Sequence, residues 1–255
     1  MSEIDDSKMP LLNHLIELRS RLLWSFLALA VAFAASLYFA RPIFGFLVQP
    51  LLASGQTKLI YTAIFEAFFV EIKVAFFAAT FFSFPVFATQ LWRFVAPGLY
   101  KKEKNAFLPF LLATPVLFLL GAAMAYYMAI PVALKYLLGF GGIVGGVQQE
   151  ALPGVDNYLS FVMKFIFGFG ISFLLPVLLM LLERAGIVTL EQLRGARRYA
   201  IVGAFAIAAV LTPPDVVSQL LLAIPLCILF EMALVAIWFT RRRRAKAEAA
   251  EEVVT

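Results

Sequence analysis

The sequence predicts an all-α, polytopic membrane protein with six transmembrane helices in a kinked and curved bundle and both termini in the cytoplasm. Hydrophobic residues make up 63% of the chain and charged residues 15%, whereas a soluble domain holds about 45–50% apolar and about 25% charged residues. Six apolar runs are candidate spans, and five of them are long enough to cross a bilayer. Basic residues gather in alternate connections between these runs.

The predicted spans follow one another closely along the chain. The first is expected to be retained rather than cleaved, because the segment before it, MSEIDDSKMP, is acidic and its apolar run is longer than that of a signal peptide. We expect a single membrane domain, 1–255, with a cytoplasmic lead-in at 1–21, spans within 22–240 and a loose cytoplasmic tail at 241–255. The spans are 22–40, 66–92, 107–131, 157–183, 199–212 and 218–240.

The lead-in is expected to be an amphipathic helix. In HLIELRSRL and the residues before it, polar side chains recur at three- and four-residue spacing on one face, and leucines occupy the other. Such a helix lies along a membrane surface. We therefore expect it to follow the cytoplasmic surface and then turn into the first span.

The distribution of Lys and Arg sets the expected orientation. With both termini inside, the cytoplasmic segments carry three, four, four and five basic residues in chain order, whereas only Arg41, Lys58 and Lys135 lie outside. Basic residues concentrate on the cytoplasmic side of membrane proteins. The imbalance of sixteen to three therefore predicts cytoplasmic termini.

Prolines inside the apolar runs predict kinks, because a proline removes a backbone donor and clashes with the preceding turn. They occur at Pro85, Pro109, Pro115, Pro176 and Pro225.

The fifth span is short, with 14 residues between Arg198 and Pro213. They make roughly 21 Å of helix, against a hydrocarbon core of about 30 Å. Either the bilayer is thinner there or the boundary is displaced by two or three residues. The glycine-rich stretch 137–157 is expected to be a flexible external loop.

Little in the chain suggests catalysis. A single cysteine, Cys227, and a single histidine, His14, provide no Cys/His metal cluster, and no Walker, HExxH or GxSxG motif occurs. We expect no enzyme activity, cofactor or metal. The alternative function is a secondary transporter of a small solute, which needs a polar site near the membrane midplane. Lys164 and Glu231 are the candidate residues for such a site.

Two carboxylates stand among basic residues on the predicted inner face. Glu17 lies in HLIELRSRL, and Glu103 lies in WRFVAPGLYKKEKN, where aromatic residues also lie at headgroup level. Glu17 has two interpretations. It forms an i,i+4 pair with Arg21, worth about 0.2–0.5 kcal/mol, or it joins Glu103 in a composite site for a cationic peptide.

Four stretches, HLIELRSRL, WRFVAPGLYKKE, YLSFVMKFIFGFG and LTPPDVVSQLLLAIPLCILFE, resemble the TatC family, the multispanning subunit of the twin-arginine protein translocase. The resemblance runs from about residue 11 to residue 240. It implies the core receptor subunit of twin-arginine translocation, which binds twin-arginine signal peptides and exports folded precursor proteins across the bacterial cytoplasmic (inner) membrane with the proton-motive force. Implied partners are TatA-like and TatB-like single-span proteins, the lipid bilayer and further copies of the chain in the receptor complex, and no nucleic acid.

The resemblance also implies roles for individual residues. Glu17 and Glu103 would form the signal-peptide site, supported by Arg19, Phe94 and Pro50. Spans five and six, joined by the TPPD turn, would form the edge where partners dock. The expected structural or partner-contact residues are Pro50, Pro85, Pro213, Pro214, Asp215, Gln219 and Glu231.

Glu231 and Leu174 are unusual positions within the predicted spans. Glu231 lies ten positions before Arg241, which is roughly 15 Å of helix. An acid at that depth is either functional or a helix-paired residue that specifies packing. Members of the family often carry a glutamate in a stretch resembling SFELP. This chain has SFLLP with Leu174 in its place, so the role of that acid is not carried over.

The predicted orientation can be tested with reporter fusions. A reporter that is active only outside the cytoplasm should be active when fused after Gly142 or Pro214 and silent when fused after Lys102 or Arg194. The reverse pattern at Gly142 and Lys102 would overturn the orientation.

Overall fold

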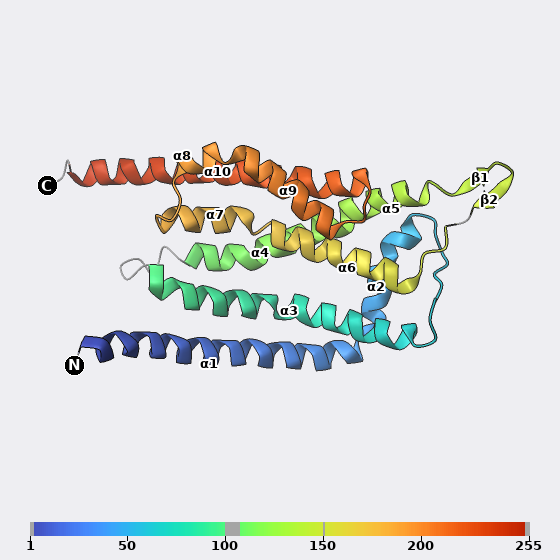
Figure 1. Cartoon of the computed structure of the whole chain (residues 1–255), viewed down its shortest axis with the longest axis horizontal. Helices are drawn as coiled ribbons and strands as arrows, with labels where there is room; N and C mark the ends of the chain where they lie inside the picture. Colours follow the sequence, from blue (N-terminus) through green and yellow to red (C-terminus); the bar gives the residue numbers. More distant parts are fainter. Residues whose placement is uncertain (1–2, 100–107, 150, 253–255) are drawn as a thin grey trace. The chain divides into compact units, whose positions relative to one another are not determined.

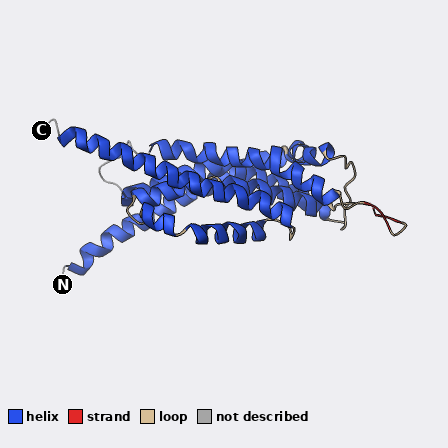
Figure 2. Cartoon of the chain, turned by 90° about the horizontal axis from the view of Figure 1, so that it is seen from above, coloured by secondary structure: helices blue, strands red, loops and turns tan. Residues whose placement is uncertain are grey.

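The computed structural model describes residues 3–99, 108–149 and 151–252, most of them in helices (Figures 1 and 2). The all-α fold class is therefore confirmed. The chain divides into two compact units, each formed by two separate stretches of sequence. The first comprises Met1–Gln49 and Tyr61–Pro115, and the second Pro50–Ile60 and Val116–Thr255.

The first unit is built on two long helices, α1 (Glu3–Tyr38) and α3 (Glu66–Leu99), which lie side by side (Figure 1). Helix α1 runs without a break from the lead-in into the first span, so the expected turn between them is wrong. No glycine or proline occurs between residues 11 and 38, and nothing interrupts the backbone ladder there. A further helix that the sequence analysis did not separate, α2 (Ala40–Ala53), follows α1.

The second unit holds the remaining spans as broken or short helices. The third span consists of α4 (Leu108–Met124), which begins in the first unit, a π-helical turn η2 (Ala125–Ala129), and α5 (Ile130–Leu138). The fourth span consists of α6 (Val155–Ser172) and α7 (Leu175–Arg184). The short helix α8 (Leu190–Gly195) leads into α9 (Arg197–Leu211) and α10 (Val216–Glu252).

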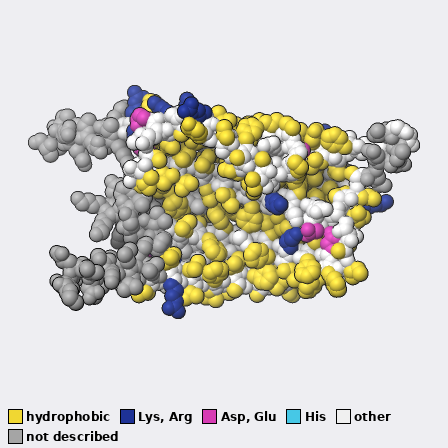
Figure 3. All heavy atoms as spheres, viewed as in Figure 1, with side chains coloured by type: hydrophobic (Ala, Val, Ile, Leu, Met, Phe, Trp, Pro, Cys, Tyr) yellow, Lys and Arg dark blue, Asp and Glu magenta, His cyan; other side chains and the backbone are white. Residues whose placement is uncertain are grey.

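Five stretches among the described residues are long and apolar enough to cross a membrane, and each matches a predicted span. The remaining predicted span is α9, with 15 residues, or about 22 Å. The helix begins two residues before the predicted start, yet it is still shorter than a hydrocarbon core of about 30 Å. Hydrophobic side chains cover much of the face seen in Figure 3, as expected where lipid is the solvent. The five stretches are Ile16–Tyr38, Glu66–Arg93, Phe110–Leu138, Val155–Arg184 and Val216–Arg242.

Two segments expected to be irregular are ordered. The outer loop contains a hairpin of β1 (Gly142–Val144) and β2 (Val147–Gln149), which projects beyond α5 and α6 (Figures 1 and 2). Gly145 and Gly146 form its turn with φ of 61° and 85°, and two glycines between valines are a hairpin signal that the sequence offered. The tail expected to be loose continues α10 to Glu252, because Ala, Glu, Lys and Arg favour helix.

The fourth span bends where α6 gives way to α7. The N–H of Phe173 donates to the Phe169 carbonyl at 3.0 Å, and the N–H of Leu174 donates to the Ile171 carbonyl at 3.0 Å. Pro176 has no N–H for the carbonyl of Ser172, so one bond of a continuous helix is missing there. The predicted proline kink in this span is confirmed.

Close approach between α4 and α6 depends on glycines within the second unit. A Cβ added at Gly121 would lie 2.5 Å from the carbonyl oxygen of Phe169, and one at Gly170 would lie 2.6 Å from the ring of Phe118. Small residues commonly allow membrane helices to pack this closely.

Gly121→Ala should therefore destabilise the protein by about 1–3 kcal/mol, because the contact is with backbone that cannot swing aside. Gly203→Ala on α9 is the matched control, since nothing lies within 4 Å of its added Cβ. The measurement is thermal unfolding of both purified variants in detergent. Equal melting temperatures for the two would contradict the packing argument.

Candidate functional site

Glu17 lies on α1 in direct contact with Arg21, one turn further along the helix. Arg21 Nη2 donates to Glu17 Oε1, and Arg21 Nη1 donates to the carbonyl oxygen of Gln90 on α3 at 3.4 Å. The Arg21 side chain is 19% exposed and that of Glu17 is 41% exposed. The i,i+4 pair that the sequence analysis considered is thus present, and its arginine also bridges two helices.

The structure describes the other residues predicted for the peptide site to different extents. Arg19 is exposed and lies two residues from Glu17 on α1, on a different side of the helix. Phe94 lies in α3 one turn after Gln90, but its side chain is outside the described residues. Glu103 also lies outside them. The first unit therefore joins Glu17 through Arg21 to the helix that carries Phe94.

The predicted structural prolines lie in different settings. Pro50 is inside α2 and buried, next to Leu51, which is also buried. Pro85 lies within α3 and is exposed. Pro213 is half-buried and Pro214 is exposed, in the turn between α9 and α10.

Asp215 caps the N-terminus of α10. Its Oδ1 accepts a hydrogen bond from the Ser218 N–H at 2.7 Å, the usual geometry of an Asp N-cap. Gln219 Nε2, one turn further on, donates to the Phe205 carbonyl of α9 at 3.3 Å. These two residues therefore hold the α9–α10 corner from within the chain.

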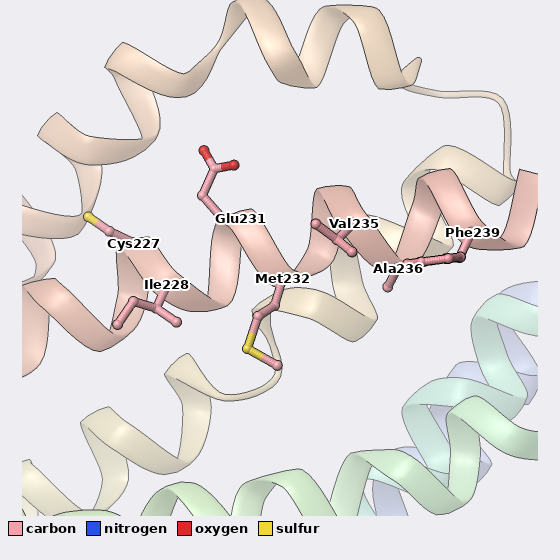
Figure 4. A pocket seen from close by; sticks show the side chains of 7 residues that line it. All are labelled: Cys227, Ile228, Glu231, Met232, Val235, Ala236 and Phe239. Atoms are coloured by element: carbon pink, nitrogen blue, oxygen red, sulfur yellow. The ribbon is translucent and has the colours of Figure 1, made fainter.

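Glu231 is paired with an arginine. Arg197 Nη2, at the start of α9, donates to Glu231 Oε2 at 2.8 Å, and both side chains are about half exposed. In Figure 4 the Glu231 carboxylate stands above α10, whereas Ile228 and Met232 point downward. Apart from Glu231, the side chains that line this shallow groove are mostly apolar.

The ion pair between Glu231 and Arg197 bears on the alternative function, a secondary transporter of a small solute. Glu231 was one of two residues available for a polar midplane site, and within the described part of the chain no ion pair joins it to Lys164. No group of three or more His, Cys, Asp or Glu residues that could hold a metal ion occurs there either. In the described structure Glu231 thus pairs with Arg197 of α9 instead.

Sequence reasoning missed an ion network that ties α7, α8 and α10 together. Arg241 Nε donates to Glu183 Oε1, and Arg241 Nη1 donates to Glu191 Oε1 at 3.4 Å. The Glu183 side chain is only 11% exposed. Hydrogen bonds from its own backbone N–H and from Thr189 lower the pKa of Glu191, and Arg241 adds to that effect.

A local signal for α8 was present in the sequence. Thr189 accepts from the Gln192 N–H at 3.2 Å, and Gln192 Oε1 accepts from the Thr189 N–H at 2.8 Å. This reciprocal capping box follows the pattern Thr-x-x-Gln. It fixes the start of α8, where Leu190 and Leu193 then pack against Phe230 of α10.

Comparisons with known proteins agree on one family. The family described as "Sec-independent protein translocase protein (TatC)" matches residues 13–225. A protein of that name from Magnetococcus marinus is 49% identical over 97% of this chain and 90% of its own length, and the Escherichia coli K12 protein is 41% identical over 98% and 94%. A crystal structure described as the twin arginine translocase receptor TatC is 42% identical, with a TM-score of 0.77 over 87% of this chain and 96% of that one.

The cap at the α9–α10 corner can be tested by substitution. Asp215→Ala should lower the free energy of unfolding by about 0.5–2 kcal/mol, because the Ser218 N–H loses its acceptor. Asp215→Asn keeps an acceptor oxygen and should lose much less. Thermal unfolding of both variants in detergent measures the difference, and equal losses would show that the carboxylate charge matters rather than the cap.

Proposed function

The chain belongs to the TatC family of Sec-independent protein translocase proteins, and we propose that it is the core receptor subunit of a twin-arginine translocase in the bacterial cytoplasmic membrane. It would bind twin-arginine signal peptides and help export folded precursors with the proton-motive force. The observation that carries this proposal is the Glu17 carboxylate, partly exposed and engaged by a guanidinium. A partly exposed carboxylate that binds one guanidinium has the charge and geometry to bind the guanidinium of an arginine ligand.

The chemistry favours arginine over lysine in the ligand. A guanidinium is planar, stays charged and presents a fork of N–H donors that fits a carboxylate with two parallel bonds. A lysine offers a point charge without that fork. We propose Glu103 as the second carboxylate, with Phe94 and Arg19 in support, so that two acids meet two adjacent arginines.

The partner edge is proposed at α9 and α10, on family analogy. Helix α9 is too short to span a bilayer of ordinary thickness, so the membrane next to it is expected to be thinner or filled by another helix. TatA-like and TatB-like single-span proteins are the proposed occupants of this edge, around Pro213, Pro214 and Gln219. We also propose that several copies of the chain assemble in the receptor complex.

Removing either acid should weaken peptide binding while the protein still folds. A charged hydrogen bond is worth roughly 1.5–3 kcal/mol, so Glu17→Gln and Glu103→Gln should each lower the affinity for a twin-arginine peptide about tenfold or more. The measurement is the affinity of purified protein for twin-arginine and twin-lysine peptides at low and moderate salt.

Glu71→Gln is the control, since Glu71 is a partly exposed acid of α3 that pairs with Arg41 at 3.2 Å. It should leave both affinities unchanged. If the Glu17 and Glu103 variants fold and prefer the twin-arginine peptide by the same margin as the wild type, the two acids are only surface ion pairs.

A further inference from the structure

Glu17 is already engaged by an arginine of its own chain. The Arg21 guanidinium uses one nitrogen for the Glu17 carboxylate and the other for the Gln90 carbonyl at 3.4 Å. A signal-peptide arginine would offer the same donors to the same carboxylate. Binding of that arginine with two parallel bonds would need both oxygens of the carboxylate, including the Oε1 that Arg21 holds, so the two guanidinium groups compete for Oε1.

We propose that Arg21 is a resident arginine, which occupies Glu17 until an arginine of the signal peptide displaces it. This inference rests on the proposed function of the same site. Arg21 would then set the affinity threshold of the receptor, because a cationic segment must bind Glu17 more strongly than Arg21 does. In this sense Arg21 sets the affinity of the site for every cationic ligand rather than the choice between ligands, and it makes no contact with the peptide itself.

The contacts of Arg21 suit a group that is displaced easily. An i,i+4 ion pair on a partly exposed helix face is weak, and the bond to Gln90 is long for an N–H···O bond. A fully buried pair could not exchange partners so cheaply, because the released arginine would lose its counter-charge away from water. Arg21 keeps 19% of its side chain exposed, so its guanidinium is not fully sealed from solvent when it leaves Glu17.

The position of Arg21 also connects the site to α3. Its second acceptor, Gln90, lies one helical turn before Phe94, a proposed site residue. Displacement of Arg21 therefore removes a contact between α1 and α3 beside the proposed site. The exposed Arg19 has no such second contact among the described residues.

Competition predicts a specific pattern of affinities. If the competent, open state of Glu17 is only partly populated, the apparent dissociation constant of every ligand is raised by the same factor. Arg21→Gln should therefore tighten the binding of twin-arginine and twin-lysine peptides alike, by about two- to fivefold, given the strength of such pairs. The ratio between the two affinities should stay at its wild-type value.

The experiment measures both peptides with purified full-length wild type, Arg21→Gln, Arg21→Lys and Arg93→Gln. Arg93 is an exposed residue of α3, so its substitution removes one positive charge from the same unit without touching Glu17. The expected gain for Arg21→Gln is about two- to fivefold over Arg93→Gln. Arg21→Lys keeps the charge but loses the fork, and it should fall between wild type and Arg21→Gln.

The outcomes separate the possibilities. Weaker peptide binding by Arg21→Gln would mean that Arg21 orients Glu17 for the ligand, and unchanged binding would mean that the pair only supports the helix; either result overturns the inference. If Arg21→Gln does not fold, Arg21→Lys decides by the same criterion. A wild type that does not prefer the twin-arginine peptide would instead refute the proposed function itself.

Discussion

An unpaired charge within a bilayer is expensive, about 2.5–3.5 kcal/mol even on insertion scales, and the placement of ionised residues in this chain follows from that constraint. Three acids among the described residues each contact an arginine, and two of these contacts join different helices. The same pairing of carboxylate and guanidinium thus holds helices together and is proposed to recognise the ligand. The pairs are Glu17–Arg21, Glu183–Arg241 and Glu231–Arg197.

The apolar runs and prolines of the sequence predicted the spans well, because hydrophobic length and a missing amide are local properties. Contacts between distant segments were not predictable in this way. The pairing of Arg241 with Glu183 depends on how α7 and α10 come together. The hairpin and α8 did have local signals, two glycines in a turn and a capping box.

The candidate site was predictable only in part. Residue type and position singled out Glu17, and helix periodicity predicted that Arg21 lies on its face. The sequence did not show that the same arginine reaches Gln90 on α3, 69 residues away in the chain. Glu17 is therefore part of a local pair in the structure, and its exchange with an incoming arginine is our proposal.

The break in the fourth span has a consequence for charge in the membrane. This chain has Leu174 where the family pattern that its sequence resembles has a glutamate, and Pro176 offers no helical donor to the carbonyl of Ser172. A backbone carbonyl accepts a hydrogen bond as a carboxylate does, yet it binds no proton at any physiological pH. The stretch 172–176 therefore contains no group that gains or loses a proton across a physiological pH gradient.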